Sequence, residues 1–219
     1  MPKILVVAAT SSELEPFMST YGIQEGQRAG LLQPDKQPSD VFVLITGAGM
    51  VNTAFELGKL IGTHFDLVVN AGVAGSFTKF EIGDVVNVTH DCFSELGAED
   101  DQKFLGIDQL GLGQQHVQAL HEFKNEFVSK IPKTNGITVN TVHGREKSIR
   151  SVIDHYQPHV ESMEGAAFLH AANAFNWKAI QLRAISNKVT KRDKSTWNLD
   201  LAITNLNETL HKLVLSVLI

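Results

Sequence analysis

The chain has 219 residues, of which 43% are hydrophobic and 20% are charged. This composition is typical of a globular protein and excludes disorder as the main state. With 19 Lys and Arg against 24 Asp and Glu, the formal net charge is −5. A mildly acidic chain without a basic block is a poor candidate for binding nucleic acid or an anionic membrane. Since no stretch resembles a linker, we expect one domain over residues 1–219.

Cysteine and histidine usage argues against a metal site or a disulfide scaffold. Cys92 is the one cysteine, and the nine histidines show no ligand spacing. His155 and His159 are four residues apart, but Pro158 between them would interrupt the helix that could align them. We therefore expect no metal and no organic cofactor.

The apolar run at 4–9 is too short for a signal peptide, and no stretch approaches the roughly 18 apolar residues of a membrane span. These features predict a cytoplasmic protein.

Apolar runs and helical periodicity alternate along the chain. In chain order they predict a strand at 3–9, a short helix near 11–17, an irregular strand within 22–37, a strand at 41–45, a helix at 51–62, and strands at 65–70 and 85–88. A Gly- and Asp-rich segment at 91–114 is long for a loop, which favours a functional or mobile role. A helix at 115–128, a strand at 136–142, helices at 145–156 and 164–175, a strand at 177–185 and an amphipathic helix at 199–217 complete the prediction.

This alternation predicts an α/β fold with a mostly parallel sheet. Ligands of such folds bind outside the carboxyl ends of the strands. The segments that follow the predicted strands are therefore the candidate site: 10–13, 46–49, 70–76 and 186–187.

Small residues follow two of these strands. Gly47 and Gly49, and then Gly72 and Gly75, would let a ligand approach the backbone closely, or would simply form turns. They are not a dinucleotide-binding fingerprint, because Asn52 stands where a third glycine is needed.

Two carboxylates and one amide are the candidate polar groups. Glu13 follows the first strand among small residues, although a carboxylate there could also be solvated or serve a helix N-terminus. Glu164 opens a helix lined by Gly and Ala, which suits either a buried polar ligand or tight packing with Glu164 as a cap. Asn187 ends the last strand, where an amide could contact the edge of a heterocycle or form an Asx turn.

Taken together, four segments resemble the nucleoside phosphorylase/nucleosidase superfamily, and within it the futalosine hydrolases of menaquinone biosynthesis. The segments are 3–13 (KILVVAATSSE), 70–76 (NAGVAGS), 161–167 (ESMEGAA) and 183–197 (RAISNKVTKRDKSTW). The resemblance covers essentially the whole chain. It implies a three-layer α/β/α sandwich around a mixed, mostly parallel, twisted sheet, and usually a homodimer or larger homo-oligomer.

The resemblance also implies residue roles. Glu164 would bind the ribose hydroxyls, Met163 would pack under the sugar, and Glu13 would activate water. The backbone wall beside ribose and base would be formed by Val73, Ala74 and Gly75. Ser186 and Asn187 would also bind the substrate, with Asn187 stabilising the departing base.

Asn187 stands where the methylthioadenosine nucleosidases carry Asp. An amide can donate to N7 or O6 of hypoxanthine, whereas a carboxylate accepts from the 6-amino group of adenine. A site built for one pattern can reject the other by about 10⁴-fold. The resemblance therefore predicts hydrolysis of futalosine, with release of hypoxanthine.

Other functions remain open at this stage. A methylthioadenosine/S-adenosylhomocysteine nucleosidase is the first alternative. A purine nucleoside phosphorylase is the second, although the loop at 8–13 contains no Arg and ends in the carboxylate of Glu13, which would repel phosphate. The third is a nucleoside-binding protein with the same fold but without catalytic activity. The carboxylated half of futalosine should meet a cation, for which the candidates are Arg145, Lys188, Lys191 and Arg192.

Overall fold

The computed structural model describes residues 2–24, 31–32, 40–78, 80–101 and 103–218. The elements are, in order, β1 (Ile4–Ala8), η1 (Ser11–Glu13), α1 (Glu15–Tyr21), β2 (Leu31–Leu32), β3 (Val41–Ile45), α2 (Met50–Gly58), β4 (Leu67–Ser76), β5 (Val85–Cys92), β6 (Gly97–Asp100), β7 (Lys103–Gly106), β8 (His116–Gln118), α3 (Glu126–Ser129), β9 (Lys133–Thr138), α4 (Glu146–Tyr156), β10 (Val160–Ser162), α5 (Gly165–Ala174), β11 (Ala179–Lys188), η2 (Lys194–Thr196) and α6 (Leu199–Leu218). Much of the segment predicted as an irregular strand, 22–37, lies outside the described residues.

Nine of the described strands form one mixed sheet, in the order β10-β9-β5-β11-β4-β1-β3-β2, with β8 paired to β5. β1, β3, β4 and β11 run parallel, so their carboxyl ends meet at the same edge. β10 also pairs antiparallel with β4, through Val160 and Glu161, and this closes one half of the sheet on itself. The predicted mixed, mostly parallel sheet is confirmed.

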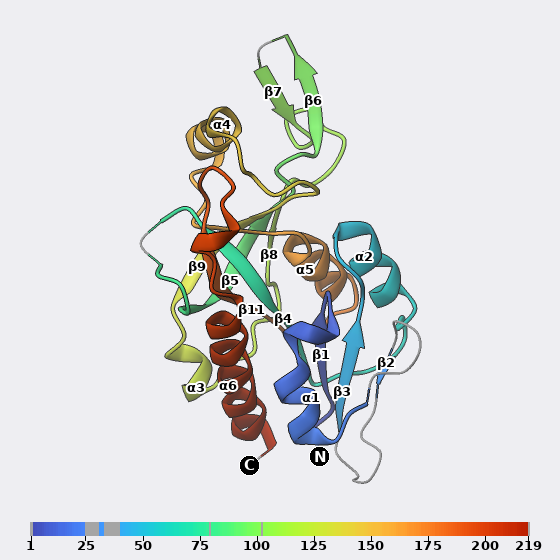
Figure 1. Cartoon of the computed structure of the whole chain (residues 1–219). Coiled ribbons are helices and arrows are strands. Elements are labelled where there is room, and N and C mark those ends of the chain that lie inside the picture. Colours follow the sequence, from blue (N-terminus) through green and yellow to red (C-terminus); the bar gives the residue numbers. More distant parts are fainter. Residues whose placement is uncertain (1, 25–30, 33–39, 79, 102, 219) are drawn as a thin grey trace.

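Helices cover both faces of the sheet (Figure 1). Alternate residues of β1 face opposite sides: Ile4 and Val6 pack in a core cluster with α1 and α6, whereas Leu5 and Val7 pack in a second cluster with α2 and α5. The apolar stripe of α6 is buried, as its periodicity predicts. The three-layer α/β/α arrangement is therefore confirmed.

Two predictions in the middle of the chain are wrong. The predicted helix at 115–128 is replaced by β8 and the short α3, because Val117 pairs with Asp91 of β5 and the segment adds a strand to the sheet. The predicted loop at 91–114 contains the β6–β7 hairpin, which projects from the sheet beside α4 (Figure 1). Periodicity cannot detect such pairing, because the partner strand is distant or the hairpin is largely exposed.

Three strands extend further than predicted. β5 continues to Cys92, β4 to Ser76 and β11 to Lys188, so the segments 71–76 and 186–187 are strand and not loop. β4 and β11 pair with each other along this stretch, from Gly72 with Arg183 to Ser76 with Lys188.

None of the described helices is long and apolar enough to cross a bilayer.

Candidate functional site

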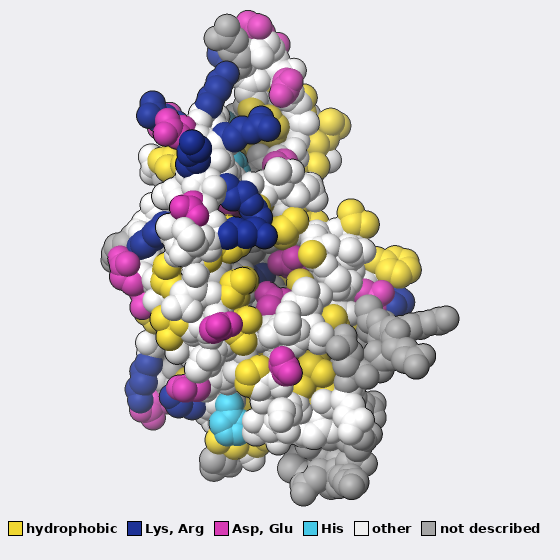
Figure 2. All heavy atoms as spheres, viewed as in Figure 1, with side chains coloured by type: hydrophobic (Ala, Val, Ile, Leu, Met, Phe, Trp, Pro, Cys, Tyr) yellow, Lys and Arg dark blue, Asp and Glu magenta, His cyan; other side chains and the backbone are white. Residues whose placement is uncertain are grey.

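A cavity of about 330 Å³ opens at the carboxyl ends of β1, β4 and β11. All the site residues proposed from the sequence line it, although they come from four separate parts of the chain: Glu13, Val73, Ala74, Gly75, Met163, Glu164, Ser186 and Asn187. The space-filling view shows a hollow on this face in which acidic side chains are visible, with Lys and Arg side chains gathered above it (Figure 2).

Glu13 is held in the cavity wall by three hydrogen bonds. Its Oε2 accepts from the backbone N–H of Thr10 at 3.0 Å and from the Thr10 hydroxyl at 3.1 Å. Its Oε1 accepts from the backbone N–H of Val73 at 3.1 Å. Burial raises the pKa of Glu13, whereas the hydrogen bond from Val73 lowers it and the charge of Glu164 raises it again. A carboxylate with a raised pKa is a stronger base than an exposed glutamate.

Glu164 reaches the same cavity from the start of α5. Its Oε1 accepts a hydrogen bond of 3.0 Å from the backbone N–H of Gly49, which begins α2. Gly47 and Gly49 both have positive φ angles, 80° and 96°, which favour glycine in this turn. The turn after β3 therefore serves to fix a carboxylate, and Ala48 within it lines the cavity.

A bulge in β11 places Asn187. Ile185 pairs with Ala74 and Asn187 with Gly75, so Ser186 is an extra residue on its strand. The Ser186 hydroxyl donates to Asn187 Oδ1 at 2.9 Å, and Asn187 Nδ2 donates to the Lys188 carbonyl at 3.0 Å. These contacts orient the amide and leave one of its N–H groups for a ligand.

Arg183 lies behind this wall and has no role in the sequence-based proposal. It is 1% exposed, and its guanidinium donates to Asn70 Oδ1 and to the Leu182 carbonyl. A Cβ at Gly72 would stand 3.0 Å from Glu13 Oε1 and 3.3 Å from Arg183 Nη1, so the two charged groups lie close to each other over that glycine. Burial lowers the pKa of Arg183, whereas the charges of Glu164 and Glu13 raise it. The feature of the sequence that could have indicated this buried group is a single cationic residue within an otherwise largely apolar predicted strand.

Asp91 is a second buried charged group near the site that was not predicted from the sequence. Its Oδ1 accepts from the Thr138 hydroxyl and its Oδ2 from Gln181 Nε2, both at 2.8 Å. Thr138 Oγ1 in turn accepts from the backbone N–H of Ala166 at 2.7 Å, in the first turn of α5. Burial raises the pKa of Asp91, and its hydrogen bonds oppose this effect. The network connects β5, β9 and β11 to the helix that presents Glu164.

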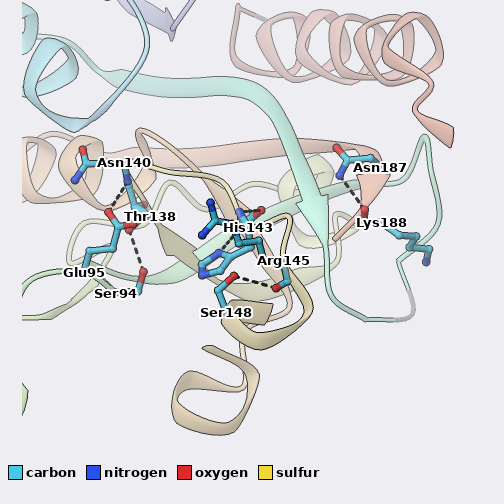
Figure 3. Close-up of polar contacts among 10 residues, drawn as sticks. Ser94, Glu95, Thr138, Asn140, His143, Arg145, Ser148, Asn187 and Lys188 are labelled. Carbon is cyan, nitrogen blue, oxygen red and sulfur yellow. Dashed lines mark hydrogen bonds and ion pairs between the residues drawn. The ribbon is translucent and has the colours of Figure 1, made fainter. Parts of the chain in front are cut away.

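One side of the cavity is basic. Lys188, Lys191 and Arg192 line it with Trp197, and the Arg192 guanidinium carbon lies 5.1 Å from the centre of the Trp197 indole. Lys188 Nζ is bound to two carbonyl oxygens and to Glu81 Oε1 at 3.0 Å, and its side chain extends away from Asn187 (Figure 3). Arg145 lies outside the cavity lining. Of the four candidate cations, Lys191 and Arg192 therefore remain free to meet a ligand in it.

Comparisons with known proteins agree with this geometry. A family model described as "Phosphorylase superfamily" matches residues 3–219. The chain is 31% identical to a futalosine hydrolase of Streptomyces coelicolor over 96% of this chain and 94% of that protein. It is 26% identical to a futalosine hydrolase of Acidothermus cellulolyticus over 93% of this chain and 87% of that protein.

Solved structures share the fold at low sequence identity. A futalosine hydrolase of Helicobacter pylori superposes with a TM-score of 0.81 at 14% identity, over 97% of each chain. A 5′-methylthioadenosine/S-adenosylhomocysteine nucleosidase of the same organism, with a bound butyl-thio-DADMe-Immucillin-A, superposes with a TM-score of 0.82 at 15% identity over 98% of each chain. The expected family fold is confirmed.

Proposed function

Because this chain belongs to the phosphorylase superfamily, we propose that it is an N-glycosidic hydrolase that cleaves futalosine into hypoxanthine and dehypoxanthine futalosine, a step of menaquinone biosynthesis. The observation that carries the proposal is the meeting of Glu13 and Glu164 in one cavity with the amide of Asn187. The curated relatives that are named futalosine hydrolases support the choice of substrate.

The ribose is held by Glu164 and Met163. Glu164 accepts hydrogen bonds from the ribose hydroxyls, and Met163 packs under the sugar, while Val73, Ala74 and Gly75 form the wall beside it. As the bond between C1′ and the base lengthens, positive charge develops on the sugar. The carboxylate of Glu164 interacts more strongly with this charge than with the neutral substrate, which lowers the barrier.

Water is the nucleophile, and Glu13 removes its proton. The cavity beside Glu13 is lined by Ala9, Thr10 and Ser12, whose small side chains leave room for a water molecule. A phosphate ion in the same place would be repelled by the carboxylate. The charge of Arg183, behind Gly72, lowers the pKa of Glu13 and so favours its ionised form.

Asn187 and the basic side of the cavity recognise the two ends of the substrate. Asn187, oriented by Ser186, donates its free N–H to hypoxanthine. Arg192, stacked on Trp197, binds the carboxylate of the aromatic half with help from Lys191.

We further propose that the protein works in the cytoplasm as a homo-oligomer. Val51 and Phe55 lie one turn apart on α2 and are 79% and 67% exposed. Large apolar side chains gathered on one helix face are typical of an interface with another subunit. This face begins two residues after Gly49, which contacts Glu164, so subunit contact would lie beside the site.

A substrate panel tests the proposal. Purified protein is incubated with futalosine, inosine and methylthioadenosine, with and without phosphate, and the free base is measured by chromatography. We expect hypoxanthine release from futalosine at the highest rate and no dependence on phosphate. Faster release of adenine from methylthioadenosine would instead identify a methylthioadenosine nucleosidase, and a phosphate requirement would identify a phosphorylase. Tight binding without base release would contradict an enzymatic role.

Asn187→Asp tests base recognition in the same assay. A carboxylate accepts a hydrogen bond from a 6-amino group but cannot donate to O6 when ionised. We expect the ratio of futalosine cleavage to cleavage of its 6-amino analogue to fall by about 10-fold or more, since one mispaired polar contact costs about 1–3 kcal/mol. Ser12→Ala, at the other side of the cavity, should leave this ratio unchanged.

A further inference from the structure

His143 and Glu161 form a pair in the wall of the same cavity. Glu161 Oε2 accepts from His143 Nδ1 at 2.6 Å, and Oε1 accepts from the backbone N–H of His143 at 3.1 Å. The side chain of Glu161 is 4% exposed and that of His143 is 14% exposed. Because an ionised carboxylate only accepts hydrogen bonds, Nδ1 carries a proton and Nε2 is the ring atom left for a ligand.

Glu161 of this pair and Asn187 lie on the two strands, β10 and β11, that flank β4. Gly75 of β4 pairs on one side with Glu161 of β10 and on the other with Asn187 of β11. A Cβ at Gly75 would lie 3.3 Å from Asn187 Nδ2 and 3.6 Å from Glu161 Cγ, so both side chains cross the same face of the glycine. Val189 Cγ2 would lie closer still, at 2.7 Å, so Val189 occupies the space over the glycine, beside the amide and the carboxylate.

The loop that carries His143 is held against the basic side of the cavity. His143 follows β9 and precedes α4 (Figure 3), and the next residue, Gly144, accepts a backbone hydrogen bond from Arg192 at 3.3 Å. His143 also lines the groove between the β6–β7 hairpin and α4. The charged group in contact with its ring is Glu161 on β10.

The chemistry at this end of the cavity needs a proton donor. When the glycosidic bond breaks, its electron pair passes to the purine, and protonation of the ring stabilises the departing base. Asn187 is a neutral amide and cannot transfer a proton. Among the described residues that line the cavity, His143 carries an imidazole, the side chain most often used for proton transfer, and Glu161 orients it.

We propose that His143, oriented by Glu161, is the general acid that protonates the departing hypoxanthine. The inference rests on the proposed function and adds a catalytic residue to it. The C1′–N9 bond breaks and its electron pair goes to the base, which takes a proton on N7 from Nε2 of the imidazolium. Water adds its oxygen to C1′ and gives its proton to Glu13. Glu13 then releases that proton to solvent, and His143 takes one up, which restores the enzyme.

His143→Gln tests this role with two substrates that differ at N7. On futalosine, the variant should lose about 10²–10⁴-fold in kcat, the usual contribution of a general acid. On N7-methylfutalosine the base already carries positive charge and needs no proton, so the ratio of variant to wild-type kcat should be far closer to one. His64→Gln, at an exposed histidine, is the matched control and should behave as wild type on both substrates.

Added imidazole gives a second measurement. His143→Ala opens the wall toward the groove, and imidazole in solution should restore part of the lost futalosine cleavage without changing cleavage of the N7-methyl substrate. An equal loss on both substrates, or no loss on either, would overturn the proposal and assign the pair a structural role. The wild-type enzyme serves as a separate test of the function itself. If it releases no base from either substrate, the proposed function fails, and this inference fails with it.

Discussion

Glu13 shows how the surroundings of one residue set its chemistry. Its carboxylate accepts three hydrogen bonds from Thr10 and Val73, which stabilise the charged form, and yet burial raises its pKa. The charge of Glu164 raises the pKa as well, and the charge of Arg183 lowers it. The balance of these effects produces a base that is oriented before substrate binds and that ionises at a higher pH than an exposed glutamate.

Glu13→Gln should therefore abolish the base with little effect on binding. We expect kcat to fall by about 10²–10⁴-fold with KM nearly unchanged, because the amide cannot accept the proton of water. A base must be ionised to act, so a raised pKa means that wild-type activity falls on acidification at a higher pH than the usual value near 4.3. The measurement is kcat against pH for both proteins. Near-normal turnover of the variant would remove Glu13 from the mechanism.

The elements around the site are held together by buried polar contacts. Thr138, at the end of β9, donates to Asp91 on β5 and accepts from the backbone of Ala166 on α5. It is fully buried, so each of these hydrogen bonds lacks a competing water. The Thr138 hydroxyl therefore helps to hold the first turn of α5, directly after Glu164.

Thr138→Val keeps the shape of the side chain and removes both hydrogen bonds. We expect the free energy of unfolding to fall by about 1–3 kcal/mol, because Asp91 and the N–H of Ala166 lose a partner. KM should rise, since Glu164 is no longer held for the ribose. Thr134→Val on the same strand removes a hydrogen bond to His159 and is the matched control. It should lower stability with KM unchanged, as urea titration and initial-rate kinetics would show. Equal KM values for the two variants would contradict the role of Thr138.

At the scale of the whole molecule, the exposed face of α2 carries the proposed subunit contact. Phe55→Glu places a charge in the middle of this face, where burial against a partner would be costly. We expect a shift to monomers in sedimentation velocity and a loss of activity at low protein concentration. Leu112→Glu is the control, because Leu112 is 75% exposed and follows the β6–β7 hairpin, far from α2 along the chain. Identical sedimentation of wild type and Phe55→Glu would place the interface elsewhere.

The elements that could be predicted from the amino-acid sequence are those that depend on local pattern. Apolar runs predicted the positions of β1, β3 and β11, and periodicity predicted α4, α5 and α6. The resemblance of four segments predicted the fold and the site residues, which the structure brings into one cavity. These features could be predicted because the spacing of apolar residues within a strand or helix indicates which of its faces is buried.

Which polar groups act together follows from the three-dimensional arrangement and could not be predicted from the sequence. The bulge at Ser186, the meeting of Arg183 with Glu13 over Gly72, and the pairing of His143 with Glu161 all join residues far apart in the chain or depend on strand register. The strand β8 likewise arises from pairing with β5, against the helical pattern of its segment. The apolar pattern of a strand indicates which face is buried, but which strand it pairs with is settled only when the sheet assembles.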